Sequence, residues 1–214
     1  MSSRSCLILV SLSVASRAGA QMPGTPVLQN AWAASGIVVA LDIGGGSGGS
    51  TAAGAAAWAP SSGRFQLSAG GGMQRASGSA SRGVYGTRLA LPLKQMMGGN
   101  VGIAAFAGIG GGAGTAKDTV RATSMVPAGL AIGYRRAVGA GGKGFSIYGA
   151  PSYQLYSGPK NKKGYIRFGL GMDAGITSKF GVTIGLESGA VAAAGTVGPR
   201  GILYGLGGSM KLGR

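Results

Sequence analysis

The sequence predicts an all-β fold: a closed antiparallel up-and-down transmembrane β-barrel of ten strands, with eight as the alternative. Three observations predict it. Hydrophobic residues alternate with small or charged ones along most of the chain, and this period of two is typical of strands. Glycine, which costs roughly 1 kcal/mol inside a helix relative to alanine, makes up 46 of the 214 residues. No segment after the N-terminus has the ~18 unbroken apolar residues that a membrane helix needs.

Residues 1–20 have the pattern of a secretory signal peptide. Arg4 supplies a positive start, Cys6 to Val14 an apolar stretch, and Ala18-Gly19-Ala20 a cleavage site of small residues. Cys6 is the only cysteine, so we expect an exported mature chain without disulfides. Residues 21–35 show no period and are interpreted as a periplasmic N-terminal lead-in, with the barrel over 36–214.

The clearest alternation runs from Gly164 to Ala192 and predicts a hairpin. One face of each strand is apolar, whereas the opposite face carries glycine and an occasional charge. A soluble sheet would turn the apolar face to a core and the other to water. A membrane barrel would turn the apolar face to lipid and fill its lumen with the other.

The other strands arrive at short intervals. Residues 37–43 alternate Ile, Val and Leu with small residues, 51–59 are almost all alanine, and 64–75 and 83–93 alternate apolar residues with arginine, glutamine or serine. Residues 101–110, 125–136 and 144–156 continue the pattern, 164–176 and the segment from Phe180 form the hairpin, and 201–212 complete the set. The alanine-rich segment is the weakest, and its loss would leave eight strands because the number must be even.

The distribution of charge decides between the two kinds of β-protein. Three of the four acidic residues fall on the inward-facing register, as do four arginines, and an arginine on the lipid face costs roughly 2–4 kcal/mol at the bilayer midplane. Inside a narrow lumen these groups can pair. The sequence therefore predicts a lumen charge network of Asp42, Arg64, Arg88, Arg135, Arg167, Asp173 and Glu187.

With a signal peptide, alternating strands and short turns over about residues 36–212, the chain resembles the small bacterial outer-membrane β-barrel family, the OmpA/OmpX/OmpW-like class. The resemblance implies a place in the cell outer membrane of a Gram-negative envelope, and insertion by the barrel-assembly machinery. Members of this family usually end on an aromatic residue, whereas this chain has Leu212-Gly213-Arg214.

The loops predict an anionic partner. The formal net charge is +16, and basic residues gather in the loops expected to face outward. We expect a cationic rim that binds lipopolysaccharide phosphates or another polyanion, alongside membrane lipid. Nucleic acid is not expected, because few aromatic residues accompany the basic ones. The rim comprises Arg75, Arg82, Lys117, Arg121, Lys160, Lys162 and Lys163.

The sequence offers little for catalysis. It contains no histidine, which removes the usual general base and the commonest metal ligand. The glycine-rich stretch at 44–49 is interpreted as a hairpin loop because no helix pattern follows it. We therefore expect no enzyme, cofactor or metal, and a monomeric barrel with a structural or surface-interaction role and a plugged lumen. A narrow anion-preferring diffusion pore (porin-like) and a soluble secreted β-sandwich that binds polyanions are the alternatives.

Overall fold

A computed structural model describes residues 30–32, 35–46, 49–75, 81–112, 123–138, 143–157, 162–193 and 196–212, with the backbone alone at 123, 163, 189–193 and 196–200. The strands are β1 (Gly36–Gly46), β2 (Gly49–Ala59), β3 (Gln66–Arg75), β4 (Ser81–Met96), β5 (Val101–Gly112), β6 (Thr123–Ala137), β7 (Gly144–Ser157), β8 (Lys162–Gly175), β9 (Phe180–Ala193) and β10 (Thr196–Leu212), with a short 3-10 turn, η1 (Met97–Gly99), after β4.

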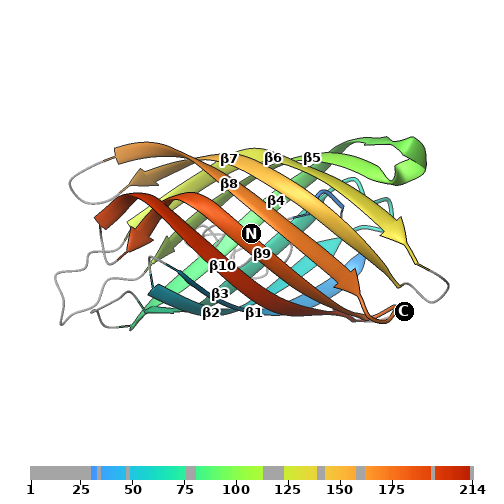
Figure 1. Cartoon of the computed structure of the whole chain (residues 1–214), viewed down its shortest axis with the longest axis horizontal. Helices are drawn as coiled ribbons and strands as arrows, with labels where there is room; N and C mark the ends of the chain where they lie inside the picture. The colour runs from blue at the N-terminus through green and yellow to red at the C-terminus, as the bar shows by residue number, and fades with distance from the viewer. Residues whose placement is uncertain are drawn as a thin grey trace, which may run out of the picture.

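The ten strands form one closed antiparallel up-and-down barrel. Each strand pairs with its neighbours in sequence, and β1 closes the sheet against β10, with Ile37 opposite Leu212 and Gly46 opposite Leu203. Figure 1 shows the strands tilted around a common axis; the connections that follow β2, β4, β6 and β8 lie with the end of β10 at one end of the barrel, called here the Leu212 end. Closure pairs every strand of the sheet on both sides, so none of the ten strands is an edge strand.

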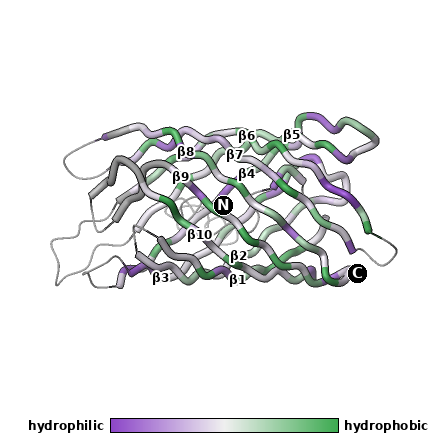
Figure 2. Tube along the Cα trace, in the orientation of Figure 1, coloured by the Kyte–Doolittle hydropathy of each residue, from purple (hydrophilic) through white to green (hydrophobic). Residues whose placement is uncertain are grey.

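The predicted alternation sets the two faces of the wall. Large apolar side chains on the outer face stay exposed on every strand; Leu41 is 74% exposed, Ile166 78% and Tyr204 64%. Their neighbours in the sequence are buried in the interior, as Asp42 and Arg167 are. Hydrophobic residues accordingly recur at intervals along the strands in Figure 2. Within the described residues, no helix is long and apolar enough to cross a bilayer.

The ten-strand prediction is confirmed, and the alanine-rich segment is a full strand. β2 pairs along its length with β1 and β3, and its inward-facing Ala53, Ala57 and Ala59 are buried. Most strands extend beyond their predicted bounds; β10 begins at Thr196 rather than at residue 201. The β-sandwich alternative is wrong, because the sheet closes on itself instead of forming two packed sheets.

A bulge lengthens β4 beyond its predicted end at Leu93. Pro92 pairs with Ala104 and Lys94 with Ile103, so Leu93 is the extra residue. Proline has no N–H to give to the ladder, and a bulge is one of the few places where a strand accepts it. The strand then continues to Met96, so the connection to β5 is shorter than the expected turn over 94–100.

A short N-terminal segment lies inside the barrel. Asn30 to Trp32, from the predicted periplasmic lead-in, lie within the lumen near the Leu212 end, and Ala31 and Trp32 pack against inward residues of β4 to β7. Gly36 begins β1 with a φ of 91°, a left-handed conformation that favours glycine where the chain changes direction.

Candidate functional site

The interior of the barrel is the candidate functional site, and its best-defined contact is a buried ion pair. Arg167 of β8 and Glu187 of β9 approach to 3.1 Å between Nη2 and Oε2, with both side chains almost fully buried. Arg167 Nη1 also donates to Gln154 Oε1 and the Tyr156 hydroxyl, each at 3.3 Å. The Tyr156 hydroxyl donates to the same Gln154 oxygen at 2.8 Å. β7, β8 and β9 are thus joined across their inner faces.

A second polar cluster joins β3 and β4. Arg82 is buried and donates from Nε and Nη2 to the side-chain oxygen of Gln74, at 3.0 and 2.7 Å. Its guanidinium lies beside Gly112 of β5, where a Cβ would come within 3.1 Å of Cζ. Arg82 was predicted on the cationic rim; it is instead an inward residue of β4, because that strand starts at Ser81, before the predicted Gly83.

Tyr148 of β7 lies in the middle of the predicted charge network. It is buried, and its phenol lies among the charged groups of Asp42, Arg88, Asp173 and Glu187. The ring covers Gly171 of the neighbouring strand so closely that a Cβ there would come within 2.2 Å of Tyr148 Cζ. Arg88 places its guanidinium 4.2 Å from the centre of the Phe106 ring, a cation–π geometry.

The hydrogen bonds that the Asp173 carboxylate accepts come from neutral donors rather than from arginine. The Ser146 hydroxyl donates to Oδ2 at 3.0 Å, the Thr183 hydroxyl donates to Oδ1 at 2.6 Å, and the Asn30 side-chain amide also donates to Oδ2. Hydrogen bonds to a carboxylate are stronger than those between neutral groups. Asp173 therefore ties the N-terminal segment to β7, β8 and β9.

Trp32 is buried in the lumen near the Leu212 end, and Arg135 lies beside it. Arg135, predicted within the lumen charge network, is exposed because it stands near the end of β6. The Arg135 guanidinium carbon lies 5.0 Å from the Trp32 ring centre, and Arg135 Nε donates to the Gly99 carbonyl at 3.0 Å. Sequence reasoning missed Trp32, because its segment has no period. The inward glycines Gly102 and Gly133, which leave room for the indole, were a signal that only the fold makes readable.

The remaining predicted residues lie apart from these clusters. Arg64 was expected in the lumen but precedes β3 and is exposed, because the strand begins two residues later, at Gln66. Arg75 and Lys162 are exposed at strand ends, as the rim requires. The backbone of Lys163 is described but its side chain is not, and Lys117, Arg121 and Lys160 lie outside the described residues, as do the predicted signal peptide and residues 21–29.

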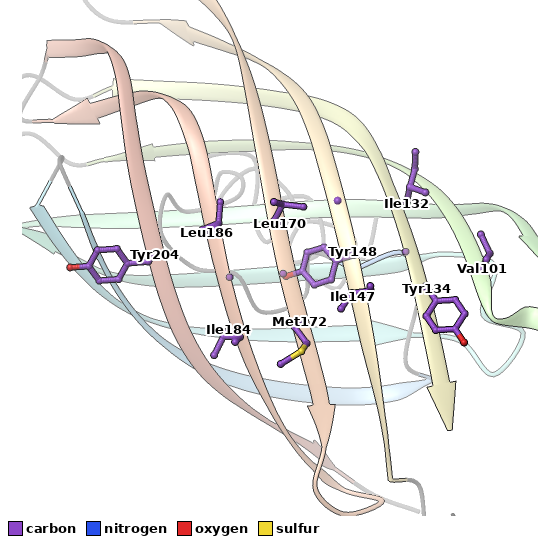
Figure 3. Close-up of a pocket in the computed structure, with 14 residues that line it drawn as sticks. Val101, Ile132, Tyr134, Ile147, Tyr148, Leu170, Met172, Ile184, Leu186 and Tyr204 are labelled. Carbon is purple, nitrogen blue, oxygen red and sulfur yellow. The ribbon is translucent and has the colours of Figure 1, made fainter. Parts of the chain in front are cut away.

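The outer wall carries an apolar hollow of about 710 Å³ across β5 to β10. Figure 3 shows Ile147, Leu170, Met172, Ile184 and Leu186 around it on successive strands. Its surface is almost entirely apolar, the composition that suits contact with hydrocarbon. In the described part of the chain, no group of three or more His, Cys, Asp or Glu side chains comes together as metal ligands would.

Comparison with known proteins adds no relative to this description. The chain matches no family model, and no curated protein matches it.

Proposed function

We propose that this protein is an outer-membrane β-barrel whose outer wall lies in hydrocarbon and whose lumen is closed. The observation that carries the proposal is the sorting of side chains by face. Exposed leucine, isoleucine and phenylalanine cover the outer wall, whereas Asp42, Arg88, Arg167 and Glu187 are buried inside. A water-soluble protein gains nothing from this arrangement, because it exposes apolar surface and buries charge.

The packed interior supports a structural or surface-interaction role over transport. Arg167 pairs with Glu187, Arg88 lies over Phe106, and Trp32 packs against the inner faces of β5 and β6. Ions crossing such a lumen would have to displace paired or packed side chains. The surface that meets external partners is then the rim of the barrel. There, exposed Arg75 and Lys162 support binding of phosphate groups on lipopolysaccharide or another polyanion.

Membrane fractionation with gel migration tests the proposal. The protein should partition with the outer membrane and need detergent for extraction. An unheated sample should migrate differently from a boiled one, because a closed barrel resists detergent unfolding. Extraction by salt or alkali alone, with no heat-dependent migration, would refute the membrane assignment.

The pore alternative rests on the small residues of the inner wall, among them Gly102, Gly112 and Gly129. Planar-bilayer conductance separates the two hypotheses. A closed barrel should give no discrete steps, whereas anion-selective steps would favour the pore and contradict the closed lumen.

A further inference from the structure

The short segment Asn30–Trp32 occupies the lumen without belonging to the wall. Trp32 is 9% exposed and Ala31 3%, and both belong to an apolar cluster with Ala104, Phe106 and Ala131. The ten strands close the barrel without this segment, because β1 begins at Gly36 and pairs directly with β10. Its presence inside therefore needs an explanation separate from the fold.

The wall is shaped to receive Trp32. A Cβ at Gly102 would have Trp32 Cε2, Cζ2 and Nε1 as its three nearest atoms, at 2.9 to 3.1 Å. A Cβ at Gly133 would lie 2.7 Å from Trp32 Cζ3. Real side chains essentially never come so close, so the indole fits because both positions are glycine. Arg135 completes the site by placing its guanidinium over the ring.

The segment is held by a small set of side-chain contacts. The Asn30 amide donates to Asp173, and the Trp32 backbone N–H donates to the Asn30 side-chain oxygen, which fixes a local turn. The indole N–H of Trp32, by contrast, is buried with no hydrogen-bond partner among the residues that the structure describes. Burying an unsatisfied donor opposes the seated state, so the apolar and cation–π contacts hold the ring against that cost.

We propose that Asn30–Trp32 is a removable plug, which closes the lumen at the Leu212 end and can leave while the barrel stays intact. Departure would free the space at Gly102 and Gly133 and uncover the side of Asp173 that Asn30 contacts. The device is an intramolecular contact that controls access to the interior from one end.

Tryptophan fluorescence tests whether the plug moves independently. The chain has two tryptophans, Trp32 and the half-exposed Trp58 of the outer wall, so a Trp58→Phe background leaves Trp32 as the only reporter. In detergent micelles, acrylamide should quench seated Trp32 weakly. Gly102→Ala should raise the quenching constant several-fold, because the added methyl occupies the position of the indole.

Heat-dependent migration in the same samples shows whether the barrel remains folded. The matched control is Gly71→Ala, whose added Cβ would meet only Val84 O at an ordinary 3.5 Å. It should leave quenching and migration unchanged. Weak quenching in Gly102→Ala, or loss of the folded band in that variant, would overturn the proposal, because the segment would then be either indifferent to the site or a necessary part of the wall.

Thiol labelling supplies a second readout. In a Cys6→Ser background, a cysteine replacing fully buried Ala131 should react slowly with a charged reagent, and Trp32→Ala should raise that rate several-fold. A cysteine replacing Ser62 in the exposed turn should react at the same rate in both. An unchanged rate at position 131 would show that Trp32 does not close the lumen. Because these assays use micelles, they stand independently of the outer-membrane assignment.

Discussion

At the residue scale, the interior depends on charged groups whose partners come from neighbouring strands. Arg167 is 1% exposed and contacts Glu187, Gln154 and Tyr156. A buried pair of this kind adds little net stability over apolar residues of the same size, but removing one member leaves an uncompensated charge. The pair therefore specifies how β8 and β9 face each other more than it strengthens the barrel.

Neutralising one member of the pair should show this asymmetry. Glu187→Gln should lower the free energy of unfolding by about 3–5 kcal/mol, because Arg167 keeps its charge in a buried site. Adding Arg167→Met should recover part of that loss, since no buried charge of the pair remains. Urea unfolding of the refolded protein in micelles measures both. A double variant that loses the sum of the two single losses would contradict the coupling.

At the element scale, the close contact of β2 with β3 depends on glycines at alternate, inward-facing positions of β3. A Cβ at Gly70 would lie 2.5 Å from Gly54 O, and one at Gly72 would lie 2.2 Å from Ala52 O. Gly71, which faces outward between them, has only Val84 O at 3.5 Å. A methyl group therefore has no room at the inward positions Gly70 and Gly72, whereas it has room at the outward Gly71.

Alanine substitution should therefore alternate in effect along β3. Gly72→Ala should destabilise the barrel by about 1–3 kcal/mol or more, as overpacking does, because the obstacle is backbone. The stability of Gly71→Ala should stay close to that of the unsubstituted protein. The urea midpoint of each variant measures its stability. Equal midpoints would mean that the inward and outward faces have been assigned incorrectly.

At the scale of the whole molecule, the outer wall has to match its surroundings. Leu170 lies on that wall, 44% exposed beside the apolar hollow. In water such a surface would aggregate, whereas in a bilayer it lies in the medium it suits. A single charge there tests the environment of the whole barrel without touching its interior.

Leu170→Arg should reduce membrane assembly, because an arginine on the lipid face costs roughly 2–4 kcal/mol near the midplane. Leu170→Met is the control, since it keeps the surface apolar at similar volume. The inward neighbour Gly171 is unsuitable for comparison, because Tyr148 covers it. The yield of heat-modifiable band in the membrane fraction measures assembly, and equal yields of the arginine and methionine variants would show that this face does not meet lipid.

Much of the architecture was predictable because a strand has a fixed period of two. The inward positions of Asp42, Arg88, Arg167 and Glu187 follow from counting along each strand, and these side chains are buried. The predicted placement of residues near strand ends was less accurate. Arg64 and Arg82 were misplaced because a strand boundary shifted by two residues moves a side chain between loop and lumen.

The sequence by itself determined the fold class, the ten strands and which face of each carries charge, because alternation is a local property of the chain. Only the tertiary structure decided the partners inside the lumen: Glu187 against Arg167, Tyr148 over Gly171, and Trp32 over Gly102 and Gly133. These contacts depend on strand register and barrel closure, which bring together residues far apart in the sequence. Asn30 and Asp173 are 143 positions apart, and no local pattern relates them.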